Sequence, residues 1–475
     1  MTLERLSSLD ASFLYLEKPA MHMHVAAIST FAPRADGPLT FDQVLEVVQH
    51  RLHLAPRLRQ RVRMVPGNIA RPLWADDERF DLDFHVRRAA VPSPGQRLQL
   101  ERAAGRVLSQ PLDRSKPLWE LYVFEGLEGG RTAVLLKMHH ALADGIGGMV
   151  IASALFDLAP DTPPGPAETT PWRADPLPSG EQLVLDAVRD QMLHPFEALA
   201  HVIQAPSRAA RRVVETATGV RALAGMGTPP AGPFDIDIGP ARRFATAEVA
   251  FERVRAMKGA LGATVNDVVL ASVASGVHDV MRSRGDRIAD RTLRVMVPMS
   301  VRSRAEAGDI GNRVAPSFID VPVGSMRPRA RLKAVRRATA SLKTSGMAVG
   351  ADAIIGLGAF APGALHATAA RLISRARWFN LVVSNIPAPQ VPLYLAGARL
   401  EASYPAMPLG ERCGLSIACT SLGGTLAFGL TADWDAAPDL EILARGIEGA
   451  IESLEAAATE RARRSTERAR RSRSG

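Results

Sequence analysis

The chain contains few cysteines and no sequence motif of a covalent nucleophile. Only two of its 475 residues are cysteines, Cys413 and Cys419. If the segment CGLSIACTS is a strand, six residues at about 3.3 Å each place the two sulfurs about 20 Å apart, too far for a disulfide. Neither cysteine has a histidine nearby in the sequence, and no serine occupies a Gly-x-Ser-x-Gly turn, so no covalent nucleophile is indicated. Two free thiols are typical of a reducing cytosol, and we expect a cytoplasmic protein.

We do not expect the start of the sequence to act as a secretory leader, and the sequence has no long unbroken hydrophobic run. Its start, MTLERLSSLD, carries acidic residues and no apolar core. Two uncharged stretches, 353–370 and 413–430, are interrupted by glycines, and we expect neither to cross a membrane. The second stretch divides at Gly423-Gly424 into two strand-like halves, which predicts a β-hairpin. The first stretch is the best candidate for a segment that lines an apolar channel or rests on a membrane.

Excess charge is scarce outside the C-terminal end. The formal net charge is +9, but the ending TERARRSTERARRSRSG holds seven arginines against two glutamates. The small excess in the rest of the chain indicates no nucleic-acid-binding surface. The tail, residues 456–475, repeats TERARRS and offers no large apolar side chain, so we expect it to be mobile. It can contact anionic lipid headgroups with about 1 kcal/mol per basic residue, and a solvated tail without a specific partner is equally consistent with its composition.

The length predicts two domains, since one hydrophobic core seldom serves so long a chain. Residues 1–160 read as mixed α/β structure, and residues 161–240 as a proline-rich crossover followed by amphipathic helical stretches. Residues 241–455 form a second α/β unit. Two α/β domains joined in this way leave a cleft between them, a common place for a small-molecule site.

Proton-handling groups are concentrated in LLKMHHALADGIGGMV, residues 135–150. An apolar strand over 131–138 delivers His139 and His140 to its carboxyl end. A histidine that acts as a base needs a suitable pKa, a fixed tautomer and access to the substrate, and this position can supply all three. Two structural histidines at a strand end are the alternative. A base without a nucleophile suits direct transfer of an activated acyl group to a hydroxyl or an amine.

The residues after the histidines favour a turn that opens a helix. Asp144 precedes a helix expected over 148–158, which it can cap, and Gly145 lets the backbone turn and leaves room for a ligand. A metal site is not expected, because no second cluster of ligands accompanies the motif. His22 and His24 alternate in a strand over 21–31, where a packed pair on one strand face is the favoured interpretation.

The motif HHALADG resembles the His-His-x-x-x-Asp-Gly signature of the CoA-dependent acyltransferase superfamily, which includes chloramphenicol acetyltransferase and peptide-synthetase condensation domains. Further motifs narrow the resemblance to the bacterial wax ester synthase/diacylglycerol acyltransferase family. In chain order they are PLDRSKPLWE, TVNDVVLA, VPMSVRS, GNRVAP, LVVSNIPAP and LYLAGA. The resemblance covers Leu6 to about Leu454.

This resemblance implies an α/β fold in which two chloramphenicol-acetyltransferase-like domains form a pseudo-dimer with an active-site tunnel between them. It makes His140 the general base that deprotonates a diacylglycerol or a long-chain alcohol, whose oxygen then attacks the thioester of a long-chain acyl-CoA. Acyl-CoA is thus a substrate, and no cofactor is implied. Because neutral histidine is required, we expect activity to fall below about pH 6. A peripheral membrane or lipid-droplet surface is an expected partner.

The resemblance also suggests roles for other residues. Asp144 is expected to hold the loop through a salt bridge with Arg302, and His139 to shape the loop, with simple packing as its alternative. Asn266 is a candidate donor near the oxyanion, worth about 2.7–4 kcal/mol in that role, or else a helix cap or buried amide. Trp119 is expected in the core. The residues expected at the tunnel wall are Gly145, Gly311 and Asn312.

Two other functions remain open at this point. A carrier-dependent enzyme of the condensation type would use the same histidine as its base. A non-catalytic protein of lipid droplets or membranes would need only the basic tail and the uncharged stretch 353–370.

Overall fold

The computed structural model describes residues 4–142, 155–163, 165, 172–189, 214, 218, 221, 225–300, 314–344, 363–375 and 377–471. In this part of the chain the strands form two six-stranded sheets and one two-stranded sheet.

The first large sheet has the order β11-β12-β1-β6-β5-β4. Its strands are β1 (His24–Phe31), β4 (Val86–Ala90), β5 (Trp119–Glu125), β6 (Thr132–His139), β11 (Tyr394–Leu395) and β12 (Ala398–Ala406). The helices of this half are α1 (Ser8–Leu16), α2 (Phe41–Arg51), α3 (Leu82–His85) and α4 (Arg97–Leu108). A small sheet pairs β2 (Gln60–Arg63) with β3 (Leu73–Asp76). Short 3-10 helices cover Leu52–Leu54, Pro56–Arg59, Pro66–Asn68 and Glu128–Gly130.

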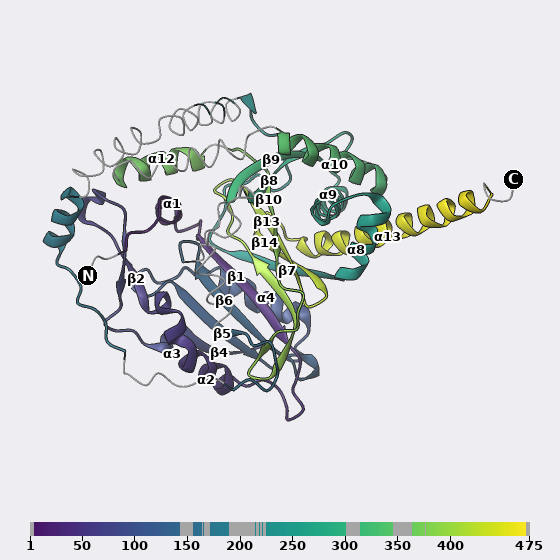
Figure 1. Ribbon diagram of the computed structural model, residues 1–475. Helices are drawn as coiled ribbons and strands as arrows, with labels where there is room; N and C mark the ends of the chain where they lie inside the picture. Colours follow the sequence, from purple (N-terminus) through teal and green to yellow (C-terminus); the bar gives the residue numbers. More distant parts are fainter. Residues whose placement is uncertain are drawn as a thin grey trace.

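The second large sheet has the order β7-β14-β13-β10-β8-β9. Its strands are β7 (Arg242–Ala250), β8 (Thr292–Ser300), β9 (Val314–Pro322), β10 (Leu381–Pro387), β13 (Leu415–Leu422) and β14 (Thr425–Asp433). The helices are α8 (Phe251–Leu261), α9 (Val265–Ser283), α10 (Pro328–Thr344), α12 (Gly363–Arg375) and α13 (Leu440–Arg471). Figure 1 shows the two sheets meeting in the middle of the molecule, with α9, α10 and α13 around the second sheet and α12 beside α1.

Local sequence explains several of these elements. Seven of the eight residues of β6 are buried, which is why this strand reads as an almost continuous apolar run. Gly423 and Gly424, with φ angles of 57° and 90°, form the turn between β13 and β14, so the predicted hairpin is confirmed. Thr264 and Asp267 form a capping box that begins α9.

The sheets do not follow the expected division of the chain at residue 241. Strands β11 and β12 come from the C-terminal half, yet β12 pairs with β1 at the edge of the first sheet. The sheets also approach closely, since a Cβ built on Gly429 of β14 would lie 1.9 Å from the carbonyl oxygen of Pro405 in β12. Alternating polarity marks a strand but does not say which sheet it joins, so the sequence could not reveal this exchange.

A helix enters the C-terminal tail, whose expected mobility stays a prediction. The helix α13 runs through most of it and ends at Arg471, and Figure 1 shows its last turns projecting from the body of the molecule. Helix nucleation is the costly step, and the buried residues Leu443, Ile447 and Ile451 stabilise the first turns of this helix. Alanine, arginine and glutamate are good helix formers, so the helix extends into the repeat.

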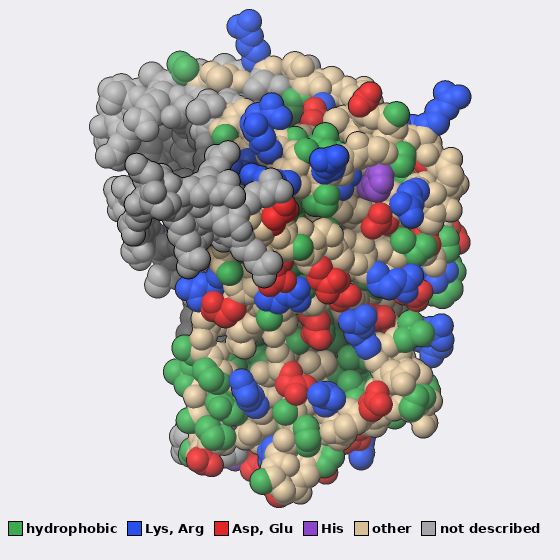
Figure 2. Space-filling model, turned by 90° about the vertical axis from the view of Figure 1, so that its right-hand side faces the viewer, with side chains coloured by type: hydrophobic (Ala, Val, Ile, Leu, Met, Phe, Trp, Pro, Cys, Tyr) green, Lys and Arg blue, Asp and Glu red, His purple; other side chains and the backbone are tan. Residues whose placement is uncertain are grey.

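A cavity of about 720 Å³ lies where the two large sheets face each other. Ile28 of β1, Tyr404 of β12 and Thr246 of β7 line it, and its charged groups are largely paired, as in the hydrogen bond of 2.6 Å from Tyr404 to Glu248. Figure 2 shows a hollow with hydrophobic side chains at its floor in the lower half of the face that it displays, with charges of both signs around it.

Within the described segments, no single helix is long and apolar enough to cross a membrane. The helices α8 and α9 meet the length and composition test only as a pair, bent by 104° at their junction.

Candidate active site

Two histidines lie at the carboxyl end of β6, as the sequence predicts. In the antiparallel pair of β1 and β6, His139 lies opposite His24. The backbone N–H of His139 donates to Leu118 at 2.9 Å, and that of His140 donates to the carbonyl of Met23 at 2.7 Å. The end of β6 is therefore held from both sides, by the segment before β5 and by the segment before β1.

His139 is buried and electrically neutral. Its Nδ1 accepts a hydrogen bond of 3.1 Å from the N–H of Ala141, so its proton lies on Nε2, which is 3.8 Å from Oε1 of Glu17. Burial, followed by the charge of Arg114 and the neighbouring His140, lowers the pKa of His139 to about 3. This ring is therefore not protonated at neutral pH, and its hydrogen bond to Ala141 is consistent with the predicted role in shaping the turn, which stays a prediction.

His140 is half-buried, and its ring stacks on Phe13 of α1 with centroids 3.8 Å apart and an interplanar angle of 23°. Its Nδ1 is completely buried, so Nε2 is the ring nitrogen that can meet a substrate. Burial lowers the pKa of His140, and the ring's interaction with its own backbone opposes this in part. The imidazole is therefore neutral at pH 7, as a general base must be.

Glu17 and Phe13 are site residues that the sequence analysis missed. Glu17 accepts the N–H of Met23 at 3.3 Å and lies 3.7 Å from Arg114. Burial raises the pKa of Glu17, while Arg114 and the hydrogen bond from Met23 lower it. Glu17 could have been found from the segment FLYLEKPAMHMH, in which an acidic residue lies shortly before the histidines at the start of a strand.

His22 and His24 form a packed pair, as the favoured interpretation holds. Their rings stack with centroids 5.3 Å apart, and Nε2 of His24 donates to the carbonyl of Leu108 at 3.0 Å. Burial is the first cause that lowers the pKa of both rings. In the part of the chain that the structure describes, no group of three or more potential ligands could hold a metal ion.

Two further predicted residues lie away from the turn. Trp119 is buried in the core, where Nε1 donates to the carbonyl of Leu58 at 2.7 Å and the ring stacks on His85. Asn266 lies in the first turn of α9, between Thr264 and Asp267 of the capping box. Its role near an oxyanion stays a prediction.

The other predicted site residues lie outside the described residues. They are Asp144, Gly145, Arg302, Gly311 and Asn312.

Comparison with known proteins agrees with this arrangement along almost the whole chain. The model of the wax ester synthase/diacylglycerol acyltransferase catalytic domain matches residues 6–269, and that of the C-terminal domain of the same family matches residues 310–455. The chain belongs to the wax ester synthase/diacylglycerol acyltransferase family. It is therefore an acyltransferase of this family, which confirms the resemblance seen in the motifs.

Relatives of this family member match over nearly their full length. A putative diacylglycerol O-acyltransferase of Mycobacterium bovis is 33% identical over 458 residues, which are 94% of this chain and 98% of the relative. A probable diacylglycerol O-acyltransferase of Mycobacterium tuberculosis is 31% identical over 471 residues, 97% of each chain.

Solved structures confirm the predicted fold. The wax ester synthase/diacylglycerol acyltransferase from Marinobacter aquaeolei VT8 matches with a TM-score of 0.68 and 25% identity, over 96% of this chain and all of that chain. The first condensation domain of the CDA synthetase matches with a TM-score of 0.55 and 16% identity, over 96% of each chain, and shows a shared fold alone. The expected α/β architecture of two related domains is thus confirmed.

Proposed function

We propose that this protein transfers a long-chain acyl group from acyl-CoA to the hydroxyl of diacylglycerol, with His140 as the general base, and that long-chain alcohols are alternative acceptors. The observation that carries the proposal is the neutral, half-buried imidazole at the end of β6, whose Nδ1 is buried and whose Nε2 remains for the substrate. The names of the relatives support diacylglycerol as the acceptor.

The reaction needs no covalent acyl-enzyme. Nε2 of His140 takes the proton of the acceptor hydroxyl while the hydroxyl oxygen forms a bond to the thioester carbon. The C–S bond then breaks, and the protonated imidazole returns its proton to the sulfur of CoA. Cys413 and Cys419 are both buried, and burial raises the pKa of each thiol to about 12, so neither is suited to replace this direct transfer by nucleophilic attack.

The test uses purified protein with palmitoyl-CoA and dioleoylglycerol, and measures both the free thiol and the triacylglycerol formed. We expect release of CoA without any carrier protein, and a loss of at least about a hundredfold in His140→Ala. A matched control is His50→Ala, because His50 is a half-buried residue of α2, far from the signature in the sequence, whose Nδ1 donates to the carbonyl of Gly165 at 3.1 Å. Transfer only from a carrier-bound acyl group would favour the condensation-type alternative, and equal rates in wild type and His140→Ala would refute the assigned base.

The location on a lipid surface is the second part of the proposal. The exposed side of α10 carries Arg329, Lys333, Arg336 and Arg337, and the helix contains no acidic residue. These four side chains would contribute about 4 kcal/mol at an anionic surface, at about 1 kcal/mol each. This basic face would hold the enzyme where its water-insoluble acceptor resides.

A vesicle-binding assay tests this location. We expect the protein to sediment with vesicles that contain phosphatidylserine and not with neutral phosphatidylcholine vesicles. The pair Arg329→Glu and Lys333→Glu should reduce binding at least tenfold, since it replaces two attractive charges by two repulsive ones. A matched control is the pair Arg102→Glu and Arg106→Glu, two exposed residues of α4. Equal losses in both pairs would mean that net charge, rather than α10, decides binding.

A further inference from the structure

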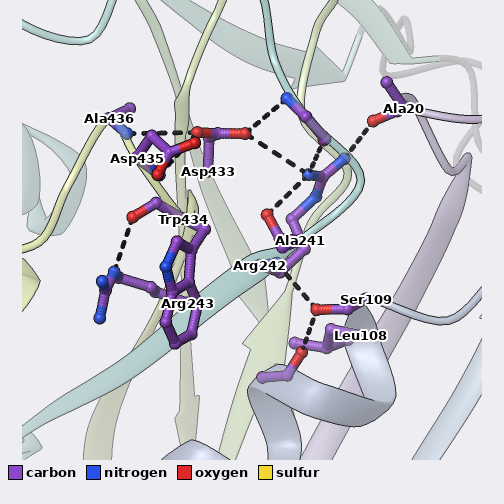
Figure 3. Close-up of polar contacts among 12 residues, drawn as sticks. Ala20, Leu108, Ser109, Ala241, Arg242, Arg243, Asp433, Trp434, Asp435 and Ala436 are labelled. Atoms are coloured by element: carbon purple, nitrogen blue, oxygen red, sulfur yellow. Dashed lines mark hydrogen bonds and ion pairs between the residues drawn. The ribbon is translucent and has the colours of Figure 1, made fainter.

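Arg242, the first residue of β7, is a buried cation at the junction of the two halves, with only 4% of its surface exposed. Its guanidinium donates to the carbonyl oxygens of Ala20 and Gly239, each at 2.5 Å, and of Ala241 at 3.0 Å. The carboxylate of Asp433, at the end of β14, lies 3.8 Å away. Figure 3 shows the guanidinium between Asp433 and Ala20, so that it links the second sheet to a segment of the first half.

The groups around Arg242 are hydrogen-bonded to one another and match the donors of a guanidinium. Oδ2 of Asp433 accepts the N–H of Gly239 at 2.8 Å, and Oδ1 accepts those of Asp435 and Ala436 at 2.9 and 3.2 Å. Burial lowers the pKa of Arg242 to about 10, with the charge of Asp433 opposing the shift, so the side chain is charged at neutral pH. A lysine would keep this charge, but as a single ammonium it cannot reproduce the planar fork of donors that reaches separate carbonyls.

The hydrogen bond from Arg242 to Ala20 binds a segment, residues 17–23, that also contacts His139 and His140. Ala20 lies between Glu17, whose carboxylate faces His139, and Met23, whose carbonyl accepts the backbone N–H of His140. Residues 17–23 therefore contact His139 at their first residue, His140 at their last, and Arg242 of the second sheet at Ala20 in between.

We propose that Arg242 is a positioning residue, which fixes residues 17–23 against the second half of the protein and so holds His140 in place for proton transfer. This proposal rests on the function assigned to His140 above. Arg242 does not touch the base, and it acts through the backbone of Ala20 and Met23. Displacement of a catalytic group by about 1 Å is enough to reduce turnover up to a hundredfold.

Arg243 offers a matched control one residue further along β7. Its Nε donates to the carbonyl of Trp434 at 2.8 Å, and its guanidinium stacks on the Trp434 ring at 3.9 Å. It thus links β7 to the end of β14, as Arg242 does, but its contacts in Figure 3 lead away from Ala20.

The experiment compares Arg242→Lys, Arg242→Gln and Arg243→Gln with wild type in the assay with palmitoyl-CoA and dioleoylglycerol, with thermal unfolding of each variant measured in parallel. For Arg242→Lys we expect kcat to fall between about tenfold and a hundredfold while the KM for palmitoyl-CoA changes less than about twofold, and a larger fall for Arg242→Gln. Arg243→Gln should keep kcat within about twofold of wild type.

Several results would overturn the proposal. They are an unchanged kcat in a folded Arg242→Lys variant, a raised KM with normal kcat, an equal loss in Arg243→Gln, or a global loss of folding in Arg242→Lys, which would make the residue purely structural. A wild-type protein that releases no CoA in this assay would instead refute the proposed function itself, so the two failures are distinguishable.

Discussion

The stack of Phe13 on His140 predicts a specific change in the pH dependence of the reaction. In wild type, burial lowers the pKa of His140, so the acid limb of kcat/KM should lie below the ordinary imidazole pKa of about 6.5. Phe13→Ala removes the ring that covers one face of the imidazole at a centroid distance of 3.8 Å. Water then reaches the imidazole, its pKa rises towards the ordinary value, and a larger fraction is protonated and inactive near pH 6.

The size of the effect follows from the stacking energy. An aromatic pair contributes about 0.5–1.5 kcal/mol beyond its buried area, which corresponds to roughly a 2- to 13-fold loss of kcat/KM at pH 8, where both proteins hold a neutral histidine. At pH 6 the loss of kcat/KM should be greater, because a larger fraction of His140 is protonated in Phe13→Ala and the remaining neutral rings are also less well positioned.

The assay measures CoA release from pH 5 to pH 9 for wild type, Phe13→Ala and Phe13→Leu, with Phe80→Leu as the control. Phe80 stacks on the buried His85 with centroids 5.2 Å apart, so its variant loses a comparable ring contact at another place. Phe13→Leu should shift the acid limb less than Phe13→Ala, and Phe80→Leu not at all. Coincident acid limbs in wild type and Phe13→Ala would refute the reasoning.

Three further predictions concern stability. His139 has a folded pKa far below its unfolded value, so unfolding binds a proton below pH 6.5, and the free energy of unfolding should fall by about 1.4 kcal/mol between pH 7.5 and 5.5 on account of this ring. Urea unfolding of His139→Asn should show a smaller fall, and an identical one would contradict the account. Lys137 is completely buried and pairs with Glu120 at 2.7 Å, so Lys137→Met should cost about 3–5 kcal/mol in denaturant unfolding. The double variant Lys137→Met with Glu120→Leu should recover part of the lost free energy of unfolding. No recovery would mean that the loss is steric rather than electrostatic. Gly429→Ala would place a Cβ 1.9 Å from the carbonyl oxygen of Pro405, so its thermal midpoint should fall by several degrees, and an unchanged midpoint would mean that the sheets separate easily.

Much of the local structure could be predicted because its signals are contiguous in the sequence. The apolar run before His139 predicts a buried strand, and the glycine pair at 423–424 predicts a hairpin; both are present. The His-His-x-x-x-Asp-Gly signature, with the motifs that follow it, predicts the family and hence the fold, and the family comparisons confirm both.

Contacts between distant segments could not be predicted in the same way. Periodicity says that β12 is a strand but not that it leaves its own half to pair with β1. The extension of α13 to Arg471 could not be predicted either, because composition describes the tail alone and not the packed turns of α13 that precede it.

The sequence by itself therefore determined the family of this protein and named His140 as its expected base, since the signature that carries both is one short stretch, residues 139–145. Only the tertiary structure decided what surrounds that histidine. Phe13 stacks on its ring, Glu17 lies beside the neighbouring His139, and Arg242 binds the backbone of the segment 17–23 at Ala20. The physical reason is that an imidazole's reactivity depends on burial and on placement within about an ångström, and both arise from side chains that are distant in the sequence and approach only when the chain folds.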